Sequence, residues 1–206
     1  MKVGVLCSGS GSNLAALLAA EQRGELGPAT VKLVIVNRAD AGAIARAEAV
    51  GVPVRILPHG DHLTREAYDR TLVANLRAAG VEIVALAGFM RRVTIELISA
   101  FPGRVLNIHP SLLPAFPGLH AQRQALVHGT RLAGCTVHLV DEGLDQGPIL
   151  LQAAVPVLDG DDEATLTARI LAEEHRLYPQ ALRLVAEGRI RVEGRRVHIA
   201  PATHAP

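Results

Sequence analysis

The sequence predicts an α/β fold: a single compact domain over residues 1–206, with a mostly parallel sheet that is Rossmann-like in its first half and gains antiparallel strands in its second. Short, continuous apolar runs alternate with helical patterns through the first half, as in parallel sheets covered by helices on both faces. In the second half, two apolar runs are joined by a connection too short for a crossover helix, which favours an antiparallel pair.

The first half of the chain alternates strands and helices in a regular order. Continuous apolar runs predict strands at residues 2–7, 31–36, 53–57, 81–89 and 104–109. Helical patterns between them predict helices at residues 12–24, 41–51, 64–80 and 94–101. In the third helix, Tyr68, Leu72 and Leu76 have the i, i+4, i+8 spacing of one buried face.

The second half changes character after a helix predicted near residue 126. Apolar runs at 134–140 and 148–157 predict the antiparallel pair, joined by the Gly-, Asp- and Pro-rich segment "DEGLDQGP". A long helix is expected from Glu163 to Glu187, followed by a hairpin over 189–199 that turns at Glu193-Gly194. The last residues, 200–206, are expected to be loose.

The composition limits the classes of partner that the protein can have. Of its 206 residues 49% are hydrophobic and 20% charged, and the net charge is only +1, which is typical of a folded globular chain without an electrostatic footprint for nucleic acid or a membrane surface. Aromatic residues make up 2%, too few for base-stacking platforms. No segment approaches the roughly 20 apolar residues of a membrane span. We therefore expect a cytoplasmic protein.

The two cysteines, Cys7 and Cys135, fall in apolar, strand-like runs. Their number and spacing give neither a disulfide framework nor a metal site. We expect both to be small buried hydrophobic residues.

The glycine-rich segment "CSGSGSNL" joins the first strand to the first helix and predicts an anion site. Glycines let backbone N–H groups turn toward an anion, and the helix N-terminus adds its positive dipole end. The details disagree with a nicotinamide cofactor, because Leu14 occupies the third glycine position and Asn37 stands where an acid should hold a ribose. A site for one phosphate group remains, and a tight turn without a ligand is the alternative.

Asn107 and His109 interrupt the last strand of the first half just before Pro110. Side chains two apart on a strand share a face, so Ile108 should point the other way, into apolar packing. Because Pro110 halts the strand at its carboxyl end, the pair should open into a cleft. An amide that donates and an imidazole that moves protons near neutral pH would together stabilise an oxyanion on a carbonyl under attack. A capping Asn and a hydrogen-bonded His are the alternative.

This pair has no nucleophile of its own, because Ser111 follows Pro110 without the Gly-x-Ser-x-Gly turn. Two substrates would then react directly, one of them supplying an attacking amine. A carboxylate beside the imidazole would favour its charged form. The loop "DEGLDQGP" offers Asp141, Glu142 and Asp145, and spacing alone does not choose among them.

Glu174 lies inside the apolar stripe of the long predicted helix. An inward-facing acid is either paired with an arginine or available to a cationic group on a ligand. The sequence does not separate these two possibilities.

Five segments, in order along nearly the whole chain, resemble the glycinamide ribonucleotide formyltransferases of the wider formyltransferase superfamily. They are "SGSGSNL", "VALAGFM", "LNIHPSLLPAFPGLHAQRQAL", "LDQGPILLQ" and "EEHRLYP". The "NIHPSLLP" segment marks the superfamily, whereas "PGLH" followed by "RQAL" and "EEHRLYP" are more specific. The resemblance implies a formyltransferase-type domain, with residues 1–105 binding the nucleotide phosphate and residues 106–206 carrying folate binding and catalysis.

The same resemblance implies an activity: transfer of the formyl group of 10-formyltetrahydrofolate to the amine of glycinamide ribonucleotide, in purine synthesis, without a metal. By analogy Asn107 and His109 are catalytic, and Asp145 is the acid that favours the charged imidazole and helps to move protons. The ribonucleotide would be held at its phosphate and at its amino end by Gly11, Ser12, Asn13 and Glu174. The folate site would be lined by Arg65, Met90, Arg91, Arg92, Val93, Asn107, Asp141, Glu142, Gly143, Leu144 and Asp145. Arg92 stands where an apolar residue is expected, although a backbone contact to the pterin would survive.

The partners implied are these two small molecules, with the chain a monomer or homodimer and neither nucleic acid nor membrane involved. A methionyl-tRNA formyltransferase shares "NIHPSLLP" but should have a further C-terminal domain and a basic surface. A formyltetrahydrofolate hydrolase should have an added regulatory domain. A ligand-binding regulator would bind without turnover, and a nicotinamide dehydrogenase is disfavoured by the glycine loop.

Overall fold

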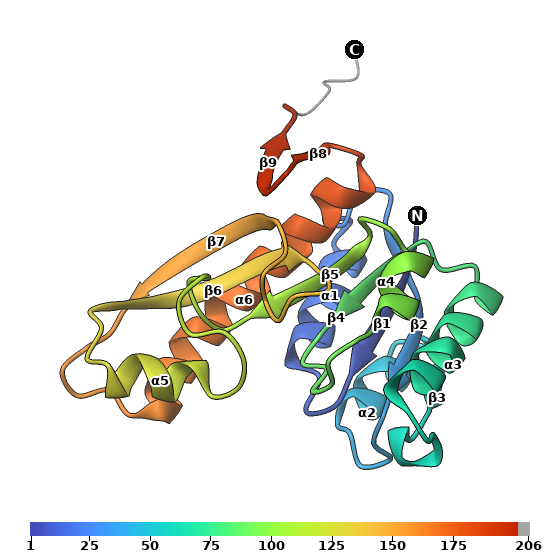
Figure 1. Ribbon diagram of the computed structural model, residues 1–206, viewed down its shortest axis with the longest axis horizontal. Helices are drawn as coiled ribbons and strands as arrows, with labels where there is room; N and C mark the ends of the chain where they lie inside the picture. Colours follow the sequence, from blue (N-terminus) through green and yellow to red (C-terminus); the bar gives the residue numbers. More distant parts are fainter. Residues whose placement is uncertain (202–206) are drawn as a thin grey trace.

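The computed structural model describes residues 1–201 and is built around one central sheet flanked by helices (Figure 1). Its first half contains β1 (Lys2–Cys7), α1 (Ser12–Gln22), β2 (Thr30–Val36), α2 (Ala43–Glu48), β3 (Val54–Ile56), the 3₁₀ turn η1 (His59–Asp61), α3 (Arg65–Ala78), β4 (Ile83–Leu86), α4 (Ile95–Ala100) and β5 (Val105–His109). Its second half contains α5 (Ala121–Val127), β6 (Leu132–Leu139), β7 (Ile149–Pro156), α6 (Glu163–Ala186), β8 (Ile190–Glu193) and β9 (Arg196–Ile199). Of the expected loose tail, residues 202–206 lie outside the described part.

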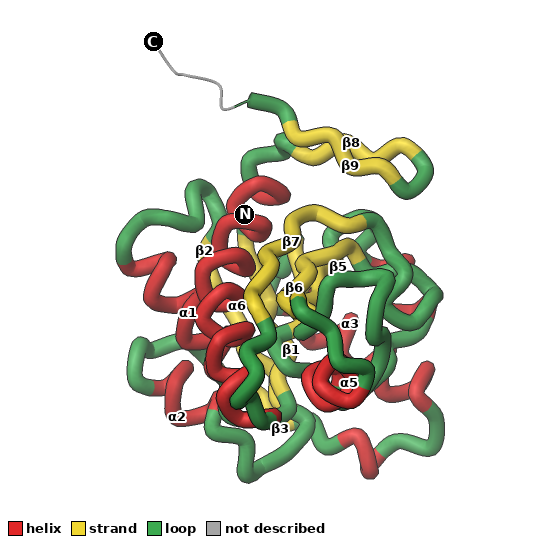
Figure 2. Tube along the Cα trace, turned by 90° about the vertical axis from the view of Figure 1, so that its left-hand side faces the viewer, coloured by secondary structure: helices red, strands yellow, loops and turns green. Residues whose placement is uncertain are grey.

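The central sheet has seven strands in the order β3-β2-β1-β4-β5-β6-β7. The first five strands are parallel to one another, and β5, β6 and β7 pair antiparallel. A second sheet, the β8–β9 hairpin, projects beyond the end of α6 (Figure 2). The predicted α/β class, the parallel first half and the antiparallel additions are confirmed.

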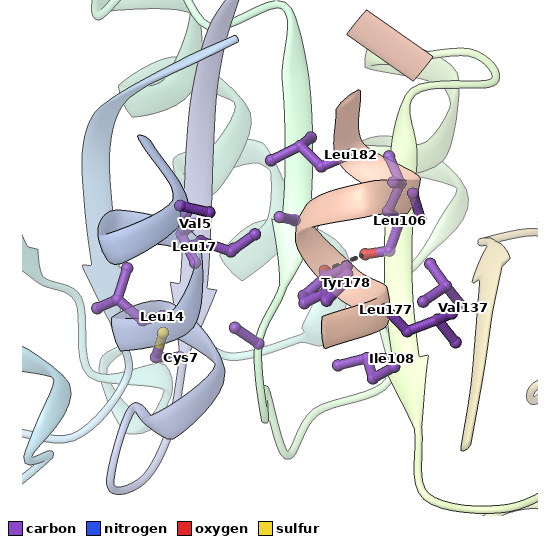
Figure 3. Packing of buried hydrophobic residues seen from close by; sticks show 14 of the residues in the cluster. Val5, Cys7, Leu14, Leu17, Leu106, Ile108, Val137, Leu177, Tyr178 and Leu182 are labelled. Atoms are coloured by element: carbon purple, nitrogen blue, oxygen red, sulfur yellow. Dashed lines mark hydrogen bonds between the residues drawn. The ribbon is translucent and has the colours of Figure 1, made fainter. Parts of the chain in front are cut away.

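Two hydrophobic clusters cover the two faces of the sheet. Strand alternation divides β1 between them, since Val5 and Cys7 belong to the cluster under α1 and α6 and Leu6 belongs to the cluster under α3 and α4. Figure 3 shows the first cluster, in which Tyr178 of α6 donates from its hydroxyl to the carbonyl oxygen of Leu106 at 3.2 Å. The same hydroxyl lies 2.9 Å from the carbonyl oxygen of Leu86. The fully buried leucines of this core each contribute about 1.5–3 kcal/mol.

The same alternation fixes the orientation of β5. Leu106 and Ile108 belong to the α1–α6 cluster, whereas Val105 belongs to the α3–α4 cluster. Asn107 and His109 therefore point to the same side as Val105, opposite to Ile108, as the period of two predicts.

The described elements depart from the prediction mainly at loop boundaries. The strand predicted at 81–89 ends at Leu86, because Gly88 adopts a left-handed conformation (φ +68°) and its carbonyl accepts from the backbone of Ser8. The long helix begins as expected, where Asp162 and Thr165 form a capping box. Within residues 1–201 no helix is long and apolar enough to cross a membrane.

Candidate active site

The candidate site forms where β5 and β6 lie side by side at the carboxyl edge of the parallel strands. In the antiparallel register Asn107 stands opposite His138, and His109 stands opposite Thr136. Asn107 Nδ2 lies 3.2 Å from His138 Nε2. His138 is 2% exposed, so this contact is a buried link between the two strands.

His109 lies between two oxygen acceptors. Its Nδ1 is 3.5 Å from Asp145 Oδ2, and its Nε2 is 2.9 Å from the carbonyl oxygen of Phe116. The ring is 5% exposed. An imidazole that carries protons on both nitrogens can donate to both acceptors, whereas a singly protonated ring can donate to only one.

Asp145 is the loop acid that the structure brings to His109. Its backbone is left-handed (φ +52°), its Oδ2 accepts from the backbone N–H of Gly118 at 2.8 Å, and its Oδ1 lies 3.7 Å from His138 Nε2. Burial opposes its ionisation, but the contact with His138, the amide of Gly118 and the charge of a protonated His109 outweigh burial and hold the pKa of Asp145 below its ordinary value.

The other two acids of that loop have different surroundings. Asp141 accepts from the backbone of Gly143 at 2.9 Å, a turn-forming contact. Glu142 is exposed, and its backbone carbonyl accepts from Arg92 Nη2 at 2.7 Å. Of the three acids between which spacing did not choose, Asp145 is therefore the one whose carboxylate lies beside His109.

Thr136 anchors the loop that follows Pro110. Its hydroxyl donates to the carbonyl of Ser111 at 2.7 Å and accepts from the backbone N–H of Leu113 at 3.0 Å. Gln152 of β7 donates to the same hydroxyl at 2.9 Å. These bonds hold the chain as it leaves β5, and with it the segment that brings the Phe116 carbonyl back to His109.

The glycine loop forms a turn that requires a glycine at its N-cap position. Gly11 is left-handed (φ +73°), and a Cβ there would lie 2.7 Å from the Cα of Ala43. Helix α1 begins at Ser12 with no side-chain cap on its N-terminus. Its first N–H groups are therefore not satisfied by a capping side chain, which suits an anion.

Glu174 lies beneath this turn. It is 6% exposed, and its Oε2 accepts from Asn13 Nδ2 at 2.7 Å. Burial raises the pKa of Glu174, and the bond from Asn13 opposes that effect. The sequence left open whether Glu174 pairs with an arginine. Within the described residues its hydrogen-bond partner is the amide of Asn13, and no arginine forms an ion pair with it.

Sequence reasoning missed two residues near this turn: a cationic arginine that contacts it, and a histidine close to that arginine. Arg46 of α2 donates from Nε to the carbonyl of Ser10 at 2.8 Å. His175 of α6 lies near enough that, after burial, the charge of Arg46 lowers the pKa of His175. Neither residue is close to the loop in sequence, so no local pattern could have identified it.

The residues expected at a folate site are brought together only in part. Met90 is 69% exposed and its backbone donates to Ser8 Oγ, Arg91 lies over the Tyr68 ring, and Val93 is buried in the α3–α4 cluster. Arg92 bridges to the 141–145 loop, in which Leu144 is 47% exposed. Arg65 is exposed at the start of α3 and, within residues 1–201, makes no hydrogen bond or ion pair from its side chain to this group.

A cavity of about 620 Å³ lies between the glycine turn and the Met90–Arg91 segment. It is lined by Ser8, Gly9, Ser10, Asn37, Arg38, Asp40, Ala41, Gly42, His59, Gly88, Met90 and Arg91. Asn107 and His109 are not among these lining residues. The cavity therefore adjoins the expected phosphate and folate segments rather than the imidazole itself.

The fold and the geometry define an α/β protein in which an amide, an imidazole and a carboxylate meet at the carboxyl edge of the parallel strands. The chain belongs to the formyl transferase family, whose family model matches residues 1–182. It is 44% identical over 192 residues to the phosphoribosylglycinamide formyltransferase of Escherichia coli. That alignment covers 93% of this chain and 90% of the E. coli protein.

Two further relatives extend this result. The chain is 50% identical over 191 residues to the trifunctional purine biosynthetic protein adenosine-3 of Drosophila pseudoobscura pseudoobscura, an alignment that covers 92% of this chain but only 14% of that longer protein. Among solved structures, glycinamide ribonucleotide transformylase 1 from Symbiobacterium toebii superposes with a TM-score of 0.96 at 55% identity, over 98% of this chain and 94% of that one.

Proposed function

We propose that the protein transfers the formyl group of 10-formyltetrahydrofolate to the amine of glycinamide ribonucleotide, a step of purine biosynthesis. The observation that carries the proposal is the placement of His109 between Asp145 and the Phe116 carbonyl, with Asn107 on the same face of β5. The alignment with the E. coli phosphoribosylglycinamide formyltransferase, over nine-tenths of that protein's length, supports the choice of donor and acceptor.

In the proposed reaction the neutral amine of the ribonucleotide attacks the formyl carbon directly. A C–N bond forms, and the electrons of the formyl C=O bond move to its oxygen. The N–H of Asn107 and the charged imidazole of His109 stabilise this oxyanion. Collapse breaks the bond between the formyl carbon and the folate nitrogen, while the proton lost by the attacking amine is delivered to that nitrogen.

Asp145 supports this chemistry by stabilising the positive charge on His109. Its low pKa keeps it ionised at neutral pH, so it can offset the charge of a buried imidazolium. The backbone N–H of Gly118 fixes the orientation of the carboxylate.

We assign the ribonucleotide phosphate to Gly11, Ser12 and Asn13, with Arg46 adding positive charge beside them. Glu174, held by Asn13, would contact the other end of the ribonucleotide. The folate would lie between the Met90–Val93 segment and the 141–145 loop, with Arg65 at its outer edge.

The proposal includes a division of labour, in which residues 1–105 bind the nucleotide phosphate and residues 106–206 carry folate binding and catalysis. The partners would be the two small molecules alone, the chain being a monomer or homodimer that engages neither nucleic acid nor membrane. We propose the cytoplasm as its compartment, since Cys7 and Cys135 are free and buried.

The test is an assay of the purified protein with 10-formyltetrahydrofolate and glycinamide ribonucleotide, followed by folate absorbance. His109→Ala should lower kcat by on the order of 10²-fold or more. His198→Ala, at a half-exposed histidine of β9, serves as the matched control and should retain wild-type kcat. Transfer to methionyl-tRNA instead, or folate consumption without any acceptor, would replace the proposal by one of its rivals.

A further inference from the structure

His138 is a buried histidine that the proposed chemistry does not use, although it contacts two members of the site. Its Nε2 lies 3.2 Å from Asn107 Nδ2 and 3.7 Å from Asp145 Oδ1. Its Nδ1 lies 3.0 Å from the carbonyl oxygen of Leu139. The ring is 2% exposed, so the Asn107 amide and the Leu139 carbonyl replace water as its hydrogen-bond partners.

The Leu139 carbonyl determines which nitrogen of His138 carries the proton. A carbonyl oxygen only accepts, so Nδ1 must donate to it. In the neutral ring Nε2 then has a bare lone pair, and the group facing it must be a donor. Asn107 meets this requirement only when its amide nitrogen, and not its amide oxygen, points at His138.

The hydrogen-bond partners around the ring match this arrangement of protons. Asp145 is the carboxylate that lies between His109 and His138, and it can offset one buried positive charge but not two. Both nitrogens of His109 face oxygen acceptors. His138 has an acceptor at Nδ1 and, within hydrogen-bond distance of Nε2, the amide nitrogen of Asn107, whereas Asp145 Oδ1 lies farther away at 3.7 Å. The hydrogen-bond pattern therefore places a proton on Nδ1 of His138 and leaves its Nε2 as the acceptor for Asn107.

We infer that His138 is a positioning residue: it fixes the Asn107 amide with one N–H donated to His138 Nε2, which leaves the second N–H free for the formyl oxyanion. This inference rests on the proposed function. Without His138 the amide can rotate and present its oxygen to the oxyanion, which would repel it. The effect belongs to the transition state, so kcat should fall while KM stays the same.

Two polar substitutions separate the two hydrogen bonds of His138. The amide of a glutamine reaches the position of Nε2, so His138→Gln keeps an acceptor for Asn107. The amide of an asparagine reaches only Nδ1, so His138→Asn keeps the bond to Leu139 and loses the bond to Asn107. We expect kcat of His138→Asn to fall about 10- to 100-fold and that of His138→Gln to stay within about threefold of wild type, with KM for both substrates nearly constant.

A double-mutant cycle with Asn107→Ala tests whether His138 acts through Asn107. In the Asn107→Ala background, adding His138→Asn should lower kcat by less than about a further threefold, because the amide that His138 positions is already gone. Equal losses in both backgrounds, or a His138→Gln variant as slow as His138→Asn, would overturn the inference. Wild-type turnover is measured first: its absence refutes the proposed function, whereas turnover with additive losses refutes this inference alone.

Nitrogen NMR of the wild-type protein gives a readout that does not depend on activity. At about pH 8 His138 should show a protonated Nδ1 and a bare Nε2. A proton on Nε2 would contradict the assignment, since Asn107 would then face it with its oxygen.

Discussion

Replacing Asp145 by asparagine removes one negative charge from the site while keeping the size and shape of the side chain. The carboxylate lies 3.5 Å from His109 Nδ1 and its side chain is 11% exposed. At an effective dielectric constant of about 20, two unit charges at that distance interact by roughly 5 kcal/mol. Part of this is lost to solvent and to adjustment of the loop, so we expect Asp145→Asn to lower kcat by about 10²- to 10³-fold, equivalent to about 3–4 kcal/mol.

The assay is a steady-state measurement of kcat and of KM for both substrates. Binding of glycinamide ribonucleotide, measured by calorimetry, should change less than about threefold, because the phosphate is held at the glycine turn. Asp159→Asn removes a similar charge from an exposed ion pair with Arg131 and should retain wild-type kcat. Full activity of Asp145→Asn, or a loss confined to KM, would refute the role assigned to this carboxylate.

Asp145 also gives a pH-dependent signature of stability. Because the pKa of Asp145 is lower in the folded protein than its ordinary value of 3.8, the ionised group stabilises the fold above that value, and the contribution disappears as the pH falls through the folded pKa. The difference in unfolding free energy between wild type and Asp145→Asn should therefore shrink as the pH falls below 3.8. A difference that grows in acid would contradict the direction of the shift.

Three further predictions concern other parts of the site. Arg92→Leu removes the donor to the Glu142 carbonyl, an interaction of about 1 kcal/mol, and should raise KM for 10-formyltetrahydrofolate roughly fivefold with kcat unchanged. Gly11→Ala forces a left-handed backbone and an overlap with Ala43, and should lower the free energy of unfolding by about 2 kcal/mol or more in a denaturant titration. Burial raises the pKa of Glu174 above its ordinary value of 4.5, so wild type should lose stability as the pH rises through the folded pKa, and Glu174→Gln should not.

Each of these predictions has an outcome that excludes it. An unchanged KM in Arg92→Leu would mean that the bridge to the 141–145 loop does not order the folate site. Gly24 has the same φ of +73° with open space around it, so Gly24→Ala measures the backbone cost alone. If Gly11→Ala costs no more than Gly24→Ala, the overlap is unimportant. Parallel stability profiles of wild type and Glu174→Gln would rule out the raised pKa.

The sheet could be predicted from sequence because its determinants are local. Continuous apolar runs and the short 141–148 connection give strand positions and the antiparallel pairing without any knowledge of distant contacts. The end of β4 could not be predicted, because "VEIVALAGF" is apolar throughout. The strand stops at Leu86 because Gly88 turns to meet Ser8, a residue 80 positions away in the chain.

In the candidate site, too, local sequence patterns predicted some features, whereas others depend on contacts between distant parts of the chain. The period of two predicted the shared face of Asn107 and His109, and the helical period predicted that Glu174 faces inward. Asp145 could not be chosen over its neighbours, because its position depends on a left-handed backbone and on the distant amide of Gly118. The sequence analysis did not identify His138, although a histidine among the apolar residues of β6 was a signal. Its contact with Asn107 follows from the register of β5 and β6, which the sequence alone does not give.

The most direct test of the central claim follows an isotopically labelled formyl group from 10-formyltetrahydrofolate through one incubation with glycinamide ribonucleotide, with products identified by mass spectrometry. The predicted result is label on the amine of the ribonucleotide, in equal amount to the tetrahydrofolate released, and little transfer in the His109→Ala protein. Label recovered as free formate, or left on the folate after incubation with the wild-type protein, would contradict the account.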